Sequence, residues 1–116
     1  MKHVDFNTVA TSAISALVPQ LKTAYLPALD LDLADATEEE AIASLLAPGR
    51  RRAFFMNAHC CNVRRHDENY AKAVAAADML LPDGIGVELA GRMTGTKLTT
   101  NLNGTDLVPA LLAKAA

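Results

Sequence analysis

The stretch ADMLLPDGIGVELA, residues 77–90, constrains the fold of this chain more than any other. Met79–Leu81 is a short apolar run of the kind that forms a buried strand. Pro82-Asp83-Gly84 ends this run, because proline fixes φ and glycine allows a positive φ. The next apolar side chains recur at i, i+4 and i+8, one face of a helix, and are Ile85, Leu89 and Met93. The stretch therefore predicts a strand, a tight turn and a helix, the repeating unit of an α/β fold.

The turn of this unit is a candidate ligand site. Small residues let a substrate approach the backbone, and free N–H groups at a helix start attract anions such as diphosphate. Asp83 would lie at the mouth of the site. An Asp-Gly pair after a strand is also common as a plain turn or a helix cap, and this alternative stays open. Gly84 and Gly86 do not extend into the G-x-G-x-x-G fingerprint, so the sequence does not predict dinucleotide binding.

Composition excludes several function classes. A chain of 116 residues is one domain at most, and a net charge of −2 gives no reason to expect nucleic acid as a partner. No apolar run approaches the roughly 20 residues of a spanning helix. The adjacent Cys60 and Cys61 indicate reduced packing thiols in a cytoplasmic protein. We expect no metal site there, because consecutive cysteines rarely reach one tetrahedral ion and no fourth ligand is evident.

The remaining pattern predicts elements on both sides of the central unit. They are a helix or loose arm over 7–18, a strand over 29–33, a helix begun by a capping box at Thr37 and ended before Pro48-Gly49, a buried strand over 53–56, a helix capped by Asp67, an extended segment over 97–102 and a helix over 107–114 capped by Thr105. Asp30 and Asp32 fall on one face of the strand over 29–33 and are more simply solvated than catalytic. We expect an α/β fold of three or four mainly parallel strands with helices on the faces of the sheet.

A second polar set, Asn57 to Asn62, follows the buried strand over 53–56 directly. The carboxyl ends of parallel strands are where ligands bind in such sheets. His59 beside a thiol could indicate nucleophilic catalysis, but neighbours in sequence seldom point at each other. Arg50–Arg52, which precede the strand, could meet a phosphate or form a solvated loop.

The motifs FFMNAHCCNV, ADMLLPDGIGVELAGRMTG and NLNGTDLV, in this order, resemble those of the WecG/TagA/CpsF glycosyltransferases, glycosyltransferase family twenty-six. The resemblance covers about residues 25–116. It divides the chain into an N-terminal helix or arm over 1–24 and the N-terminal portion of such a domain over 25–116. It implies a mainly parallel, Rossmann-like sheet. Family members continue into a second half of the domain, so we expect a truncated chain with weak activity alone.

The resemblance implies an inverting hexosyltransferase that needs no metal or other cofactor. The donor would be a UDP-sugar carrying an N-acetylmannosamine-like group. The acceptor would be a polyprenyl-diphosphate-linked sugar at the membrane surface, in exopolysaccharide, teichoic acid or common-antigen synthesis for the cell envelope. The enzyme would be cytoplasmic, peripheral at the inner membrane face. The alternative is a non-catalytic nucleotide- or anion-binding module, or an interaction fragment, and the oligomeric state, a homo-oligomer included, is open.

For the site, the resemblance implies that Asp83 is the general base that deprotonates the acceptor hydroxyl. The positions that it carries over or places as substrate-binding are Asn57, His59, Gly84, Gly86, Asn101 and Asp106. Two positions depart from the family pattern. Phe55 stands where the family has threonine, and Asn101 stands where it has arginine. Arg50–Arg52 are candidates to replace that missing cation.

Overall fold

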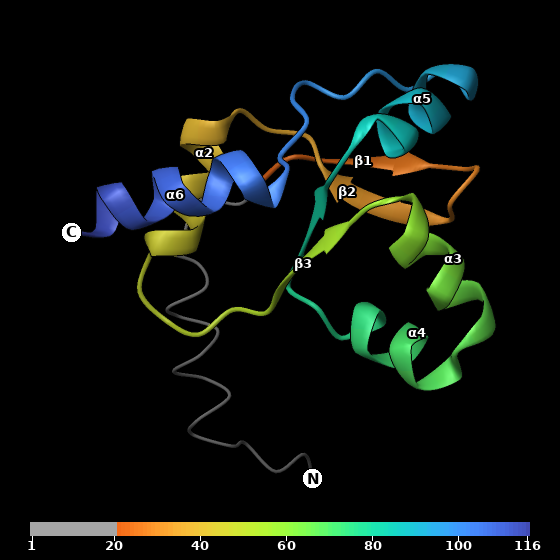
Figure 1. Cartoon of the computed structure of the whole chain (residues 1–116), viewed down its shortest axis with the longest axis horizontal. Helices are drawn as coiled ribbons and strands as arrows, with labels where there is room; N and C mark the ends of the chain where they lie inside the picture. Colours follow the sequence, from red (N-terminus) through yellow and green to blue (C-terminus); the bar gives the residue numbers. More distant parts are fainter. Residues whose placement is uncertain (1–20) are drawn as a thin grey trace, which may run out of the picture.

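The computed structural model describes residues 21–116, so the helix or arm expected over 7–18 lies outside the described residues. Figure 1 shows two small sheets surrounded by helices. The elements are β1 (Thr23–Leu26), β2 (Leu31–Ala34), α2 (Glu38–Leu46), β3 (Ala53–Met56), α3 (Ala58–His66), α4 (Glu68–Ala75), β4 (Met79–Pro82), α5 (Ile85–Met93) and α6 (Gly104–Ala115). None of the helices within residues 21–116 is long and apolar enough to cross a membrane.

The strands form one parallel and one antiparallel pair. β3 and β4 run parallel, in a register that places Ala53 opposite Met79 and Met56 opposite Pro82. β1 and β2 form an antiparallel hairpin, and β2 lies beside β4. The α/β class is thus confirmed. Within residues 21–116 one strand pair is parallel and the other antiparallel, so the expectation of mainly parallel strands is met only in part. The Rossmann-like topology stays a prediction.

The strand expected over 29–33 is present as β2, which begins two residues later and forms one arm of a hairpin that was not expected. The chain reverses between Leu26 and Leu31, and Asp30 adopts a φ of 51°, a left-handed conformation that aspartate tolerates better than most residues. The hydroxyl of Tyr25 donates a hydrogen bond to the Asp30 carboxylate at 2.6 Å. Asp30 therefore belongs to the turn, and only Asp32 has the exposed strand position that was expected of both residues.

Local capping signals predict two helix starts correctly and a third incorrectly. Thr37 and Glu40 form the reciprocal capping box of α2, and the Asp67 side chain caps α4 by accepting from the Tyr70 N–H at 3.0 Å. For α6 the cap is Asn103 instead of Thr105, so the helix begins at Gly104, three residues before the predicted start. Asparagine and threonine are both good caps, and spacing alone does not choose between them.

The core has two parts that share β3. The hairpin-side cluster is formed by Leu26, Leu31, Leu33, Met56, Cys61, Val74, Val87 and Leu98. The α6-side cluster is formed by Ala34, Ala41, Leu81, Leu102 and Leu107. Successive strand residues face opposite sides, so Phe54 packs on the first cluster and Phe55 on the second. The segment expected to be extended over 97–102 forms no strand, and it contributes one buried leucine to each cluster.

The apolar stripe of α5 lies on the outside of the protein. Ile85, Leu89 and Met93 do share one helix face, as predicted, but they are 80%, 55% and 79% exposed. The buried face of α5 carries Val87 and Gly91 instead. A Cβ at Gly91 would lie 2.7 Å from the Thr96 carbonyl oxygen, so no side chain fits at this position.

Candidate active site

The parallel pair brings two of the predicted site residues to one edge. β3 ends at Met56 and β4 ends at Pro82, and these two residues are register partners. Asn57 and Asp83 follow them directly, and the Asp83 N–H donates to the Met56 carbonyl oxygen at 3.1 Å. The expectation that both residues lie at the carboxyl ends of neighbouring parallel strands is therefore confirmed.

The Asp83 side chain has no structural task in the described part of the chain. The N-cap of α5 is Gly84, which has no side-chain cap, so the helix-cap interpretation of Asp83 is wrong. Within residues 21–116 no donor bonds to the Asp83 carboxylate and no cation pairs with it, and the residue is only partly buried. A carboxylate whose lone pairs are free can accept a proton from a substrate.

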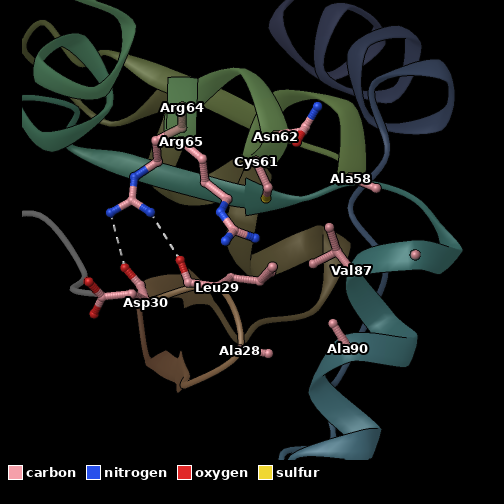
Figure 2. Close-up of a pocket in the computed structure, with 11 residues that line it drawn as sticks. Ala28, Leu29, Asp30, Ala58, Cys61, Asn62, Arg64, Arg65, Val87 and Ala90 are labelled. Carbon is pink, nitrogen blue, oxygen red and sulfur yellow. Dashed lines mark hydrogen bonds between the residues drawn. The ribbon is translucent and has the colours of Figure 1, made fainter. Parts of the chain in front are cut away.

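A pocket of about 530 Å³ opens beside this edge, between the hairpin turn, α3 and α5 (Figure 2). Ala58 and Gly86 line it, and both belong to the first turns that follow β3 and β4. A Cβ at Gly86 would lie 3.1 Å from the Ala58 Cβ, so the two helix starts approach closely. Asp83 is not among the lining residues. The pocket therefore adjoins the candidate catalytic turn without including the carboxylate.

Sequence reasoning missed the cationic side of this pocket. Arg64 and Arg65 both line it from α3. The sequence does indicate that Arg65 faces the pocket, because Ala58, Cys61 and Arg65 recur at helical spacing and so share one face of α3. Burial raises the pKa of the Cys61 thiol, which fits the packing role expected of that residue.

Two residues fix the backbone of the turn that carries Asp83. Gly84 has a φ of 97°, which favours glycine, and its N–H donates to the Asn101 side-chain oxygen at 2.9 Å. The next residue, Leu102, donates its N–H to the Pro82 carbonyl oxygen at 2.8 Å. Asn101, at the position of the family arginine, thus holds the turn through its amide oxygen.

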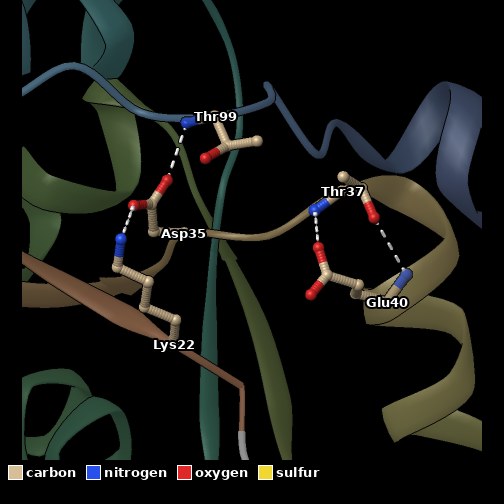
Figure 3. Close-up of polar contacts among 5 residues, drawn as sticks. All are labelled: Lys22, Asp35, Thr37, Glu40 and Thr99. Carbon is tan, nitrogen blue, oxygen red and sulfur yellow. Dashed lines mark hydrogen bonds and ion pairs between the residues drawn. The ribbon is translucent and has the colours of Figure 1, made fainter.

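Asp35 anchors the segment that precedes Asn101, through a contact with Thr99 (Figure 3). Its carboxylate accepts a hydrogen bond from the Thr99 N–H at 2.7 Å and lies 3.7 Å from the Lys22 ammonium. Its side chain is 10% exposed. Hydrogen bonding to Thr99, opposed in part by burial and reinforced by Lys22, holds the pKa of the Asp35 carboxyl below its ordinary value of 3.8.

We expect Asp35→Asn to lower the free energy of unfolding by about 1 kcal/mol at neutral pH. A lowered folded pKa means that the unfolded chain takes up the proton first. The stabilisation is therefore complete above the ordinary carboxyl pKa and is lost as the pH falls through the folded value. Urea unfolding between about pH 7 and about pH 3 measures the effect. Asp32→Asn, on the exposed side of β2, is the control and should leave the free energy of unfolding at neutral pH unchanged. Parallel curves for Asp35→Asn and the unaltered chain would contradict the assignment.

The other predicted site residues lie near helix starts. The Asn57 side-chain oxygen caps α3 by accepting from the Cys60 N–H at 2.8 Å, and His59 is exposed in the first turn of that helix. The Asp106 carboxylate accepts from the Asn103 side chain at 3.0 Å at the start of α6. Their roles in substrate binding stay predictions.

The two departures from the family pattern have different outcomes. The Phe55 ring packs 3.5 Å from the position of a Cβ at Gly104, so it belongs to the α6-side cluster. Arg50–Arg52 precede β3, whereas Asp83 follows β4, so these arginines lie at the opposite end of the parallel pair, about 13 Å away along a strand of this length. Arg51 donates to the carbonyl oxygens of Ala47 and Pro48. The expectation that these arginines replace the family cation is therefore wrong.

Two comparisons with known proteins find sequence matches to this chain. The model of the glycosyl transferase WecG/TagA/CpsF family matches residues 26–116. An N-acetylglucosaminyldiphosphoundecaprenol N-acetyl-beta-D-mannosaminyltransferase from Bacillus spizizenii is 41% identical over 46 residues, 40% of this chain and 18% of that relative. The matched part thus spans under a fifth of the relative's length. No solved structure matches the chain. Because the family match includes β2 to α6 and the turn that carries Asp83, this chain belongs to the WecG/TagA/CpsF family of glycosyltransferases.

Proposed function

We propose that this chain carries the catalytic carboxylate of an inverting hexosyltransferase that transfers an N-acetylmannosamine-like sugar from UDP to a polyprenyl-diphosphate-linked sugar. The observation that carries the proposal is the uncommitted carboxylate of Asp83 at the shared edge of β3 and β4. The name of the Bacillus spizizenii relative, which contains a diphosphoundecaprenol acceptor and an N-acetylmannosaminyl group, supports this donor sugar and acceptor. The reaction would take place on the cytoplasmic side, at the membrane surface that holds the acceptor.

In the proposed reaction, Asp83 accepts the proton of the acceptor hydroxyl as its oxygen attacks the anomeric carbon. The new glycosidic C–O bond forms while the bond from the anomeric carbon to the diphosphate oxygen breaks, and UDP leaves with that electron pair. Attack opposite the leaving group inverts the anomeric carbon. Gly84 and Gly86 present backbone without side chains at this edge. The Gly84 N–H is bonded to Asn101, so the N–H groups that can stabilise the departing diphosphate are those of the uncapped first turn of α5. The reaction as proposed uses no metal.

A non-catalytic nucleotide-binding module of the same fold is the second candidate. Two observations favour it. The family threonine is replaced by a phenylalanine ring that packs in the core, and the family arginine is replaced by Asn101, whose amide oxygen is bonded to the Gly84 N–H. Such a module would retain the anion-binding backbone and lack the rate of a transferase.

UDP titration followed by a transfer assay separates the two candidates. A ligand that binds only the folded chain raises its stability, by about 2.7 kcal/mol at a hundredfold excess over Kd. We expect UDP to raise the unfolding temperature of the chain. We also expect UDP to be released from UDP-N-acetylmannosamine only when a lipid-linked acceptor is present. UDP binding without transfer would support the second candidate. No stabilisation by UDP would contradict both.

A further inference from the structure

The apolar stripe on α5 continues into the pocket beside it. Successive residues of a helix are rotated by about 100°, so Ile85, Leu89 and Met93 span about 80° of α5. Gly86 and Ala90, which line the pocket, lie within about 60° of the edge of that stripe. These two residues add no polar group, and Val87 and Leu29 extend the apolar lining. One apolar surface therefore runs from the exposed face of α5 into the pocket.

The opposite side of the pocket carries an available cation. Arg64 is engaged, because its guanidinium donates to the carbonyl oxygens of Leu29 and Asp30 at 3.0 and 3.2 Å. Arg65 has neither an ion pair nor a hydrogen bond with any residue in 21–116, and Figure 2 shows its guanidinium directed into the space between α3, the hairpin turn and α5. The Asp30 carboxylate is bonded to the Tyr25 hydroxyl and turned away from that space.

We propose that this pocket is the acceptor subsite and binds a polyprenyl diphosphate, with its phosphates at Arg65 and its first isoprene units along Ile85, Leu89 and Met93. The inference rests on the proposed function. Guanidinium groups suit phosphate oxygens, and exposed apolar side chains that adjoin a cleft suit a hydrocarbon chain. A sugar carried on the diphosphate would lie next to Ala58 and Gly86, at the edge that holds Asp83.

The same geometry disfavours a nucleotide as the occupant of this pocket. Ribose and uracil require several hydrogen-bonding partners, whereas the polar lining side chains besides the two arginines are Asn62 and Asp30. A nucleotide would also leave the three apolar side chains of α5 exposed to solvent, because it has no hydrocarbon chain to cover them. An amphiphile with an anionic head uses both features.

Farnesyl diphosphate, a short and soluble polyprenyl diphosphate, tests the proposal by calorimetric titration of the whole chain. We expect Arg65→Gln to weaken its binding about tenfold, because a charge-assisted hydrogen bond is lost. Leu89→Ser should weaken binding about fivefold, because apolar contact is lost. The matched controls are Arg50→Gln, an exposed arginine in the loop before β3, and Leu112→Ser, an exposed leucine on α6. Both should bind as the unaltered chain does.

Two further ligands distinguish the sources of the phosphate. Farnesol should bind more weakly than farnesyl diphosphate and should not respond to Arg65→Gln. UDP should bind independently of Arg65 and should not displace farnesyl diphosphate. Competition by UDP together with loss of UDP binding in Arg65→Gln would overturn the proposal and assign the pocket to the nucleotide.

The outcome also separates this inference from the proposed function. If UDP binds and sugar is transferred, but farnesyl diphosphate binds unchanged in Arg65→Gln and Leu89→Ser, the acceptor subsite alone is wrong. If farnesyl diphosphate responds as expected and no sugar is transferred, the subsite stands and the transferase activity is wrong.

Discussion

Replacing Asp83 by asparagine is expected to slow sugar transfer about a thousandfold, within the range typical of a lost general base. The amide has the shape of the carboxylate but cannot accept the proton of the acceptor hydroxyl. The fold should be unaffected, because the carboxylate is engaged by no donor or cation within residues 21–116. The rate of UDP release in the presence of acceptor measures the effect.

The division between kcat and KM identifies the cause of this loss. An interaction made only in the transition state lowers kcat and leaves substrate binding unchanged. We expect Asp83→Asn to bind UDP and farnesyl diphosphate as the unaltered chain does. Asp32→Asn, which changes an exposed carboxylate on β2, is the control and should retain full activity. Turnover by Asp83→Asn at the original rate would remove Asp83 from the mechanism.

Replacing Leu81 by alanine is expected to lower the free energy of unfolding by about 3 kcal/mol. Leu81 is fully buried in the α6-side cluster, and its register partner on β3 is Phe55. The loss combines the transfer free energy of the removed atoms with the cavity they leave. For a domain of this size the unfolding temperature should fall by about 15 °C. Equilibrium unfolding in urea, fitted with one dependence of the unfolding free energy on urea concentration for both proteins, measures this loss.

Leu112→Ala is the matched control for this variant. It removes the same atoms from a side chain of α6 that is 64% exposed, so we expect a change within about 0.5 kcal/mol. Equal effects of the two substitutions would mean that the cluster around Leu81 does not stabilise the fold. Loss of secondary structure in Leu81→Ala alone would mean a stronger effect in the expected direction.

Elements specified by contacts close in sequence were predictable. The capping box at Thr37 and the Asp67 cap need only residues three positions apart, and both helices begin where expected. The β1–β2 hairpin was missed because its turn depends on Asp30 in a left-handed conformation. Such a conformation is usually indicated by a glycine, and this turn has none. The start of α6 was misplaced because Asn103 and Thr105 are comparable caps.

The candidate site was predictable in part for the same reason. Asn57 and Asp83 each follow a short apolar run, and parallel pairing of the two runs is enough to bring them to one edge. Helical spacing placed the apolar residues of α5 on one face but could not show whether that face meets the core or solvent. The pocket depends on where the hairpin turn lies relative to α3, which only the folded chain determines.

The placement of Phe54 and Phe55 on opposite sides of β3 has a consequence for motion. Each side of the strand is covered by a different cluster, so an opening of α6 or of the hairpin uncovers one side and leaves the other packed. β4 also faces both clusters, through Leu80 and Leu81, and it lies between β2 and β3, whereas β3 pairs on one edge only. We therefore expect the amide protons of β4 to exchange more slowly than those of β3. Asp83 therefore follows the better-protected strand of the parallel pair, and local opening of α6 or of the hairpin should leave the position of its turn unchanged.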